Sequence, residues 1–261
     1  MGSKIKIIDY NIRYTDDGEN RMIADRAPRL EALIRKYEPD VIGLQEASRR
    51  WIDFLDDHLY DAYKMRYLYR NERSIEATPI LWKRDKFDLV KEGHFWLSDM
   101  PEMSTKSFGS YHHRICNFVL LRLKETGETF YYVNTHMSGG EASARSAELI
   151  LKRMEEREAF SKYGLLLNGD FNVTPESRCG KIFNESGKVR DLNLDLGNNE
   201  SSTVNGYNDP DYAYDRIIDY IYYTPAFMKP LTYQILNEEI MGGYISDHRG
   251  LYAEVELKEE E

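Results

Sequence analysis

The chain has 261 residues, a mass of 30.7 kDa and a net charge of -10, and 41% of its residues are hydrophobic. A chain of this size buries a large core, and because it shows no linker, repeat or low-complexity tract we expect a single domain over residues 1–261. The acidic charge disfavours tight nonspecific binding to a polyanion, so a phosphate substrate would need an added cation.

The number of cysteines and the length of the apolar runs exclude further classes of protein. Cys116 and Cys179 are too few for a disulfide framework and fit no zinc spacing. No apolar run approaches the roughly 20 residues that span a bilayer, so we expect no integral membrane segment. The start of the chain has no signal-peptide core. Because Met1-Gly2-Ser3 has the composition of an added leader, a soluble cytoplasmic protein and a secreted protein that has lost its signal both remain open.

Apolar periodicity predicts strands and helices in alternation at the start of the chain. The expected elements are a strand that begins at 5–8 and ends within 10–13, a helix over 23–37, a strand over 40–46 and a helix over 51–58.

The rest of the chain is mostly β. The expected strands are 62–69, 78–82, 87–90, 115–123, 129–135, 165–167, 217–223, 231–236 and 251–257, with a helix over 142–160 and another beginning at Thr174 and Pro175. Many strands with few helices predict an α+β fold, a four-layer α/β/β/α sandwich of two mainly antiparallel sheets flanked by helices.

Several of these strands end in polar residues that can bind a phosphate or a metal. The clearest case is the apolar run 165–167, which is followed by Gly169, Asp170 and Asn172 in a tight loop. Asp219 lies in an apolar run, and a buried carboxylate needs a hydrogen-bonding or cationic partner.

Each of these residues also has a simpler explanation. Asn11 and Glu46 are typical strand-end caps, His136 alone is typical of a buried core histidine, and Asp247-His248 or Gly169-Asp170 can be a plain turn. Together, acidic, amide and imidazole groups at several strand ends favour a site for a hard divalent cation and a phosphate.

Six motifs stand in a fixed order along the chain. They are Tyr-Asn-Ile-Arg with Asn11, Leu-Gln-Glu with Glu46, Asn-Thr-His with His136, Gly-Asp-Phe-Asn with Asp170 and Asn172, Ile-Asp-Tyr-Ile with Asp219, and Ser-Asp-His with Asp247 and His248. From Tyr10 to His248 the chain thereby resembles the endonuclease/exonuclease/phosphatase superfamily, whose members include nucleases, inositol-polyphosphate phosphatases and sphingomyelinases.

The resemblance implies a metal site. Glu46 would hold Mg²⁺, with Mn²⁺ as the other possible ion, and Asn11 and Asp247 would assist directly or through water. Oxygen ligands of this kind suit either ion.

The resemblance also implies catalytic roles. Asp170 would orient or deprotonate the attacking water, and Asn172 would donate a hydrogen bond to the phosphate. Asp219 would fix the tautomer of His248, whose other nitrogen would donate to the phosphate.

A second carboxylate and imidazole pair is expected between Glu76 and His136. Apurinic endonucleases carry a tyrosine where His136 stands, so the site looks closer to the deoxyribonuclease pattern. Residues expected near the substrate are Arg13, Arg84 and Arg114, with Trp96, Tyr111, His112 and His113 as pocket walls.

These expectations describe a monomeric Mg²⁺-dependent phosphodiesterase of nuclease type, acting on a phosphate ester that nucleic acid could provide. A phosphomonoesterase on a small or lipid-derived phosphate and a noncatalytic binding scaffold of the same fold are the alternatives. A sugar-binding β-sandwich would use the 20 tyrosines but leaves the paired Asp and His residues unexplained.

Overall fold

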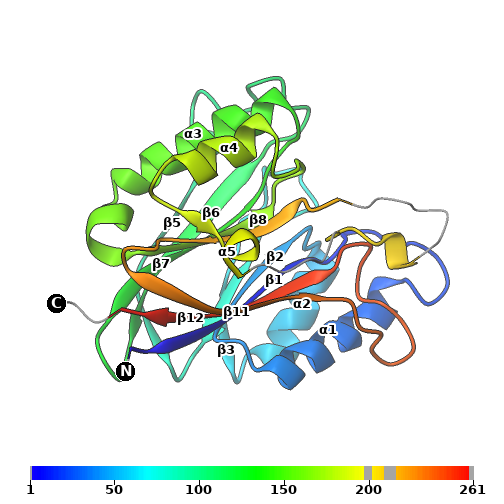
Figure 1. Ribbon diagram of the computed structural model, residues 1–261. Helices are drawn as coiled ribbons and strands as arrows, with labels where there is room; N and C mark the ends of the chain where they lie inside the picture. The colour runs from blue at the N-terminus through cyan, green and yellow to red at the C-terminus, as the bar shows by residue number, and fades with distance from the viewer. Residues whose placement is uncertain (1, 197–201, 209–215, 259–261) are drawn as a thin grey trace.

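The computed structural model describes residues 2–196, 202–208 and 216–258. Two six-stranded sheets pack face to face, and helices cover both outer faces (Figure 1). The predicted α+β sandwich of four layers is therefore confirmed.

The first sheet carries two helices on its outer face. Helices α1 (Ile23–Tyr37) and α2 (Arg49–Leu59) pack on it through a shared apolar cluster. Its strands lie in the order β11 (Met228–Leu236), β12 (Gly250–Leu257), β1 (Lys4–Asn11), β2 (Val41–Gln45), β4 (Ile80–Lys83) and β3 (Tyr63–Arg66). Strands β1 and β2 run parallel, and the other described pairs are antiparallel.

The second sheet repeats this plan. Helices α3 (Glu141–Glu155) and α4 (Arg178–Glu185) cover its outer face. The strand order is β5 (Phe87–Trp96), β6 (Ile115–Leu123), β7 (Thr129–His136), β8 (Leu165–Asp170), β10 (Asp219–Tyr223) and β9 (Arg190–Asp191). Here β7 and β8 are parallel, so each sheet holds one parallel pair among its described strands.

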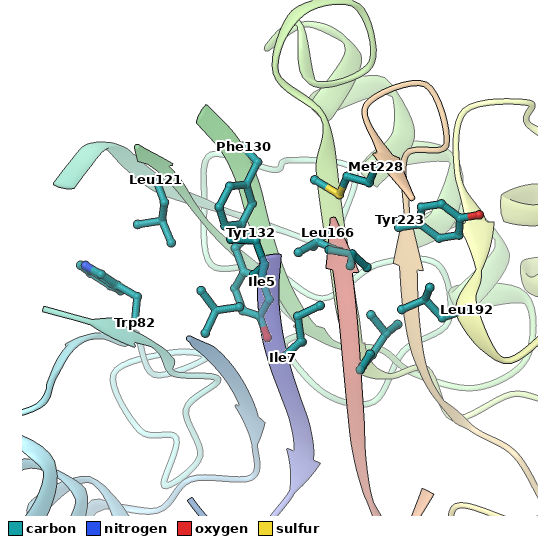
Figure 2. Packing of buried hydrophobic residues seen from close by; sticks show 14 of the residues in the cluster. Ile5, Ile7, Trp82, Leu121, Phe130, Tyr132, Leu166, Leu192, Tyr223 and Met228 are labelled. Carbon is teal, nitrogen blue, oxygen red and sulfur yellow. The ribbon is translucent and has the colours of Figure 1, made fainter. Parts of the chain in front are cut away.

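The main core lies between the two sheets. Ile5 and Ile7 of β1 face Phe130 and Tyr132 of β7 across this layer, and Leu166 of β8 packs beside them (Figure 2). Burying a side chain of this size stabilises the fold by roughly 1.5–3 kcal/mol. Because alternate residues face opposite sides of a strand, the neighbouring Ile8 packs against the helices instead.

Two predicted boundaries differ from the structure by five residues or more. Strand β5 continues to Trp96 rather than ending at Val90, because a bulge between Leu89 and Lys91 interrupts the alternation that the sequence showed. The predicted helix over 142–160 ends at Glu155 and is followed by one π-helical turn, η1 (Ala159–Tyr163).

The predicted start of the helix after β8 is wrong. The cap is Ser177, whose hydroxyl accepts a hydrogen bond from the Gly180 amide at 3.1 Å, and Thr174 and Pro175 lie in the preceding turn. The short elements β9, α5 (Leu192–Leu196) and the 3₁₀ turn η2 (Gly206–Asn208) were not predicted.

Cys116 and Cys179 are buried free thiols. Within the described ranges, no helix combines the length and the apolar character needed to cross a membrane.

Candidate active site

The candidate site lies where the carboxyl ends of the two parallel strand pairs meet. Asn11 ends β1 beside β2, and His136 ends β7 directly opposite Asp170 at the end of β8. Asp219 begins β10 opposite Asp170 on its other side. Since parallel strands present their carboxyl ends at one edge, residues far apart in sequence converge here.

Asp170 is the centre of this group. Its Oδ2 accepts a hydrogen bond from Asn11 Nδ2 at 3.0 Å and lies 3.4 Å from His136 Nε2 and 3.9 Å from His248 Nε2. Its Oδ1 accepts a hydrogen bond from the backbone amide of Asn172 at 2.8 Å. Burial and the nearby Asp219 charge raise the pKa of Asp170, so its carboxylate takes up a proton more readily than an ordinary aspartate.

Gly169 permits this close arrangement. Its φ is +147°, and a Cβ added there would lie 1.9 Å from the Thr135 carbonyl oxygen of β7. Only glycine lets β8 approach β7 this closely just before Asp170.

Asp219 and His248 form the pair that the sequence predicted. The Nδ1 atom of His248 lies 3.1 Å from Oδ1 and 3.0 Å from Oδ2 of Asp219, and both side chains are buried. Burial alone would lower the pKa of His248, but the adjacent Asp219 carboxylate outweighs it and raises this pKa well above its ordinary value. His248 is thereby kept protonated, with Nε2 directed toward Asp170.

The predicted direct pair between Glu76 and His136 is not formed. The Arg70 guanidinium lies between them, in an ion pair with Glu76 and 2.7 Å from His136 Nδ1. Because a guanidinium only donates, Nδ1 must accept and the ring proton must sit on Nε2. Burial and the charges of Arg114 and Arg70 lower the pKa of His136, so this histidine is neutral.

Asn172 follows the strand in a left-handed conformation, with φ of 55°. Its Nδ2 donates to the Met137 carbonyl at 3.0 Å and lies 3.1 Å from His136 Nε2. Its exposed amide therefore borders the space next to Asp170 and His136.

Glu46 is the carboxylate best placed to bind a cation. One oxygen of each of Glu46 and Glu76 and one nitrogen of His136 lie within 4.8 Å of one another. Glu76 is already neutralised by Arg70, whereas Glu46 accepts from the Asn11 amide at 3.1 Å and from the Tyr14 backbone amide at 3.3 Å. One or two carboxylates with water and phosphate form a typical Mg²⁺ site, and Glu46 fits that description.

The two other predicted ligands are oriented toward protein groups. Asn11 donates through Nδ2 to Glu46 and Asp170, and its oxygen accepts from the Arg13 backbone amide at 3.1 Å. The Asp247 carboxylate lies 3.6 Å from the Arg13 guanidinium. Unlike Asp247, Glu46 forms no ion pair with a described residue and accepts only from two amide groups, so its carboxylate is the more available to a cation.

The residues expected to contact substrate divide into two groups. Tyr111, His112 and His113 line a pocket beside the site, and Arg114 is buried behind it. Arg84 instead donates to the Tyr60 carbonyl at 2.8 Å and lies away from the site.

Sequence reasoning missed Arg70 and Asp9. Asp9 is fully buried next to the site, and burial followed by the Asp219 charge raises its pKa well above the usual value. The signal that identified Asp219, a lone carboxylate in an apolar run, was present at Asp9 too. Arg70 stands in a polar loop, where nothing in the sequence distinguishes it from a surface residue.

Comparison with known proteins gives a consistent family match. Residues 10–248 match the model of the Endonuclease/Exonuclease/phosphatase family, as the ordered motifs led us to expect. A curated yeast protein, the probable RNA exonuclease NGL3 of Saccharomyces cerevisiae, is 28% identical over 195 residues, which are 66% of this chain. The match spans only 38% of that yeast protein.

Solved structures share the fold over 98% of this chain. An endonuclease/exonuclease/phosphatase from Bacteroides vulgatus is 24% identical with a TM-score of 0.87, covering 98% of this chain and 100% of that one. A mannosyl-6-phosphatase from Bacteroides thetaiotaomicron is 25% identical with a TM-score of 0.83 and the same two coverages.

Proposed function

Because the chain belongs to the endonuclease/exonuclease/phosphatase family, we propose that it is a Mg²⁺-dependent hydrolase of phosphate esters, and specifically a phosphodiesterase of nuclease type. We also propose that residues 1–261 form one catalytic domain and that the protein acts as a monomer. The observation that carries it is the convergence of Asn11, His136, Asn172 and His248 on the Asp170 carboxylate, with Glu46 one hydrogen bond away through Asn11.

Glu46 would hold the metal, with Asn11 and Asp247 reaching it directly or through water. A bound Mg²⁺ would neutralise the phosphate and the charge that develops on the leaving oxygen. It would also supply the positive charge that a chain of net charge -10 lacks.

Asp170 would orient the attacking water and accept its proton. A raised pKa suits this role, because a stronger base takes the proton more readily at neutral pH. The neutral amide of Asn172 would donate to a phosphoryl oxygen without adding negative charge beside it.

The two histidines would act as hydrogen-bond donors of different charge. His248, protonated because it faces Asp219, would donate from Nε2 to the phosphate as negative charge builds up. His136, neutral because Arg70 faces its Nδ1, would donate from Nε2 without carrying charge. Glu76 would act on His136 only through Arg70.

A phosphomonoesterase is the second candidate, favoured by the 25% identity to a mannosyl-6-phosphatase. A substrate panel separates the two. We expect bis(p-nitrophenyl) phosphate and a thymidine oligonucleotide to be hydrolysed faster than p-nitrophenyl phosphate, with activity lost in EDTA and restored by Mg²⁺. Turnover of the monoester alone would establish the second candidate, and activity that survives EDTA would refute metal dependence. Absence of turnover with Mg²⁺ or Mn²⁺ would favour a noncatalytic scaffold.

A further inference from the structure

A basic pocket adjoins the candidate active site. Its volume is about 420 Å³, and it lies between the loop over 70–76 and the loop over 106–113. Three of its ten lining residues are cationic and one is acidic, although the whole chain carries a net charge of -10. The cations are Arg70, Arg73 and Lys106, and the acid is Glu76.

Two of these cations are available to a ligand. Arg70 is paired with Glu76, but Arg73 and Lys106 are exposed and form no ion pair with another described residue. His112 and His113 add no charge at neutral pH, because burial and nearby cations lower the pKa of each. Like charges gathered in this way repel one another, and a bound anion relieves that repulsion.

The inner wall of the pocket is held in place by hydrogen bonds to Arg70. The Arg70 carbonyl accepts from Trp96 Nε1 at 2.8 Å and from the Ser104 hydroxyl at 3.1 Å, and its amide donates to the Glu76 carbonyl at 3.2 Å. Arg114, which follows the lining residue His113 in the chain, is 9% exposed, and its Nη1 has no hydrogen-bond partner among the described residues. These hydrogen bonds fix the backbone at Arg70, where the loop that carries Arg73 begins.

The pocket is joined to the reaction centre through Arg70. The guanidinium touches Nδ1 of His136, whereas Nε2 on the other side of the ring faces Asp170. An anion in the pocket would therefore lie across His136 from the phosphate that is cleaved. Tyr111 at the rim is 87% exposed and offers a free ring face on which a base can stack.

We propose that this pocket binds a second phosphate group of the substrate, and that the preferred substrate is a short nucleotide chain with a terminal phosphate next to the scissile one. This inference rests on the proposed phosphodiesterase function.

The test compares two substrates in the same preparation, thymidylyl-thymidine with and without a terminal phosphate, at saturating Mg²⁺. We expect kcat/KM to be about tenfold or more higher with the terminal phosphate, since two unpaired cations would bind it. In Arg73→Ala/Lys106→Ala the ratio should fall toward one. Because the ratio is taken within one variant, differences in folded fraction cancel.

Lys229→Ala is the matched control. Lys229 is exposed on β11 and pairs in register with Glu256, which lies opposite Lys4 at the end of the sheet far from Asn11. Lys229→Ala removes one of the two positive charges that the double variant loses, at a position outside the pocket, so it should keep the ratio of the unmodified protein. A ratio near one in the unmodified protein, or an unchanged ratio in the double variant, would overturn the proposal.

A binding measurement separates failure of the pocket from failure of the enzyme. If neither dinucleotide is hydrolysed, the proposed function fails, and the pocket is tested by calorimetric titration with inorganic pyrophosphate in metal-free buffer. Binding that weakens about tenfold in Arg73→Ala/Lys106→Ala but not in Lys229→Ala supports the pocket. Equal binding by all three proteins, or no binding by the unmodified one, refutes it.

Discussion

Replacing Asp219 by Asn tests whether Asp219 works through His248. The substitution keeps the size of the side chain but removes the charge that faces Nδ1 of His248 at 3.0 and 3.1 Å. A hydrogen bond to a charged group contributes about 1.5–3 kcal/mol. If that contribution is needed in the transition state, kcat should fall about 10- to 150-fold, because each 1.36 kcal/mol is tenfold in rate.

The assay is steady-state hydrolysis of bis(p-nitrophenyl) phosphate by Asp219→Asn, His248→Ala and the double variant. If Asp219 acts only through His248, the Asn substitution should cost little in the His248→Ala background. Equal losses from Asp219→Asn in both backgrounds would refute the reasoning. Asp191→Asn is the control, since Asp191 is another buried aspartate on the same sheet and should retain kcat.

Three further predictions concern single carboxylates. Asp170→Ala should lower kcat by on the order of a hundredfold or more while circular dichroism shows an intact fold, and near-normal turnover would remove Asp170 from the chemistry. Glu46→Gln should raise the Mg²⁺ concentration for half-maximal activity by about tenfold or more, and an unchanged metal titration would exclude Glu46 as a ligand. Burial raises the pKa of Asp191 from 3.8 to about 7, so the stability that its neutral form provides is complete below about pH 4 and is lost as pH rises through 7. The free energy of unfolding measured in urea should therefore rise for Asp191→Asn relative to the unmodified protein, by up to about 4 kcal/mol between pH 4 and pH 8. If the difference in free energy between the two proteins stays constant across that range, the assignment is contradicted.

The sequence predicted the strand ends because their signals are local. The apolar run of Leu165, Leu166 and Leu167 identifies β8, and the polar residues after it must then lie at its end. Which strand ends meet was inferred from the family resemblance, and the structure places Asn11 of one sheet 3.0 Å from Asp170 of the other.

The contacts around His136 could not be predicted in the same way. The family pattern placed Glu76 near His136, but it carried no information about a cation from the loop between β3 and β4. Arg70 and Arg73 stand three residues apart in that loop, and only the folded chain shows that Arg70 turns inward while Arg73 stays exposed. That difference places a cation, rather than the Glu76 carboxylate, beside Nδ1 of His136, and the pKa of His136 is lowered.

A layer of buried polar side chains explains how the two sheets hold their ends together. The Asp9 carboxylate of β1 accepts from Gln45 of β2 and from Asn168 of β8, both at 2.6 Å, and Gln45 also donates to Asn134 of β7 at 2.8 Å. Gly43 makes room for this layer, since a Cβ there would lie 1.9 Å from the Asn168 amide.

Two of these three hydrogen bonds, from Asn168 to Asp9 and from Gln45 to Asn134, cross from one sheet to the other directly beneath the candidate site. Apolar packing is non-directional and would tolerate small shifts between the sheets, whereas hydrogen bonds fix both distance and direction. Burying Asp9 is costly, as its raised pKa indicates, and this cost is offset only if the partners are held in one arrangement. The polar residues one layer below the strand ends therefore set the distance between Asn11 and Asp170, and with it the geometry on which hydrolysis would depend.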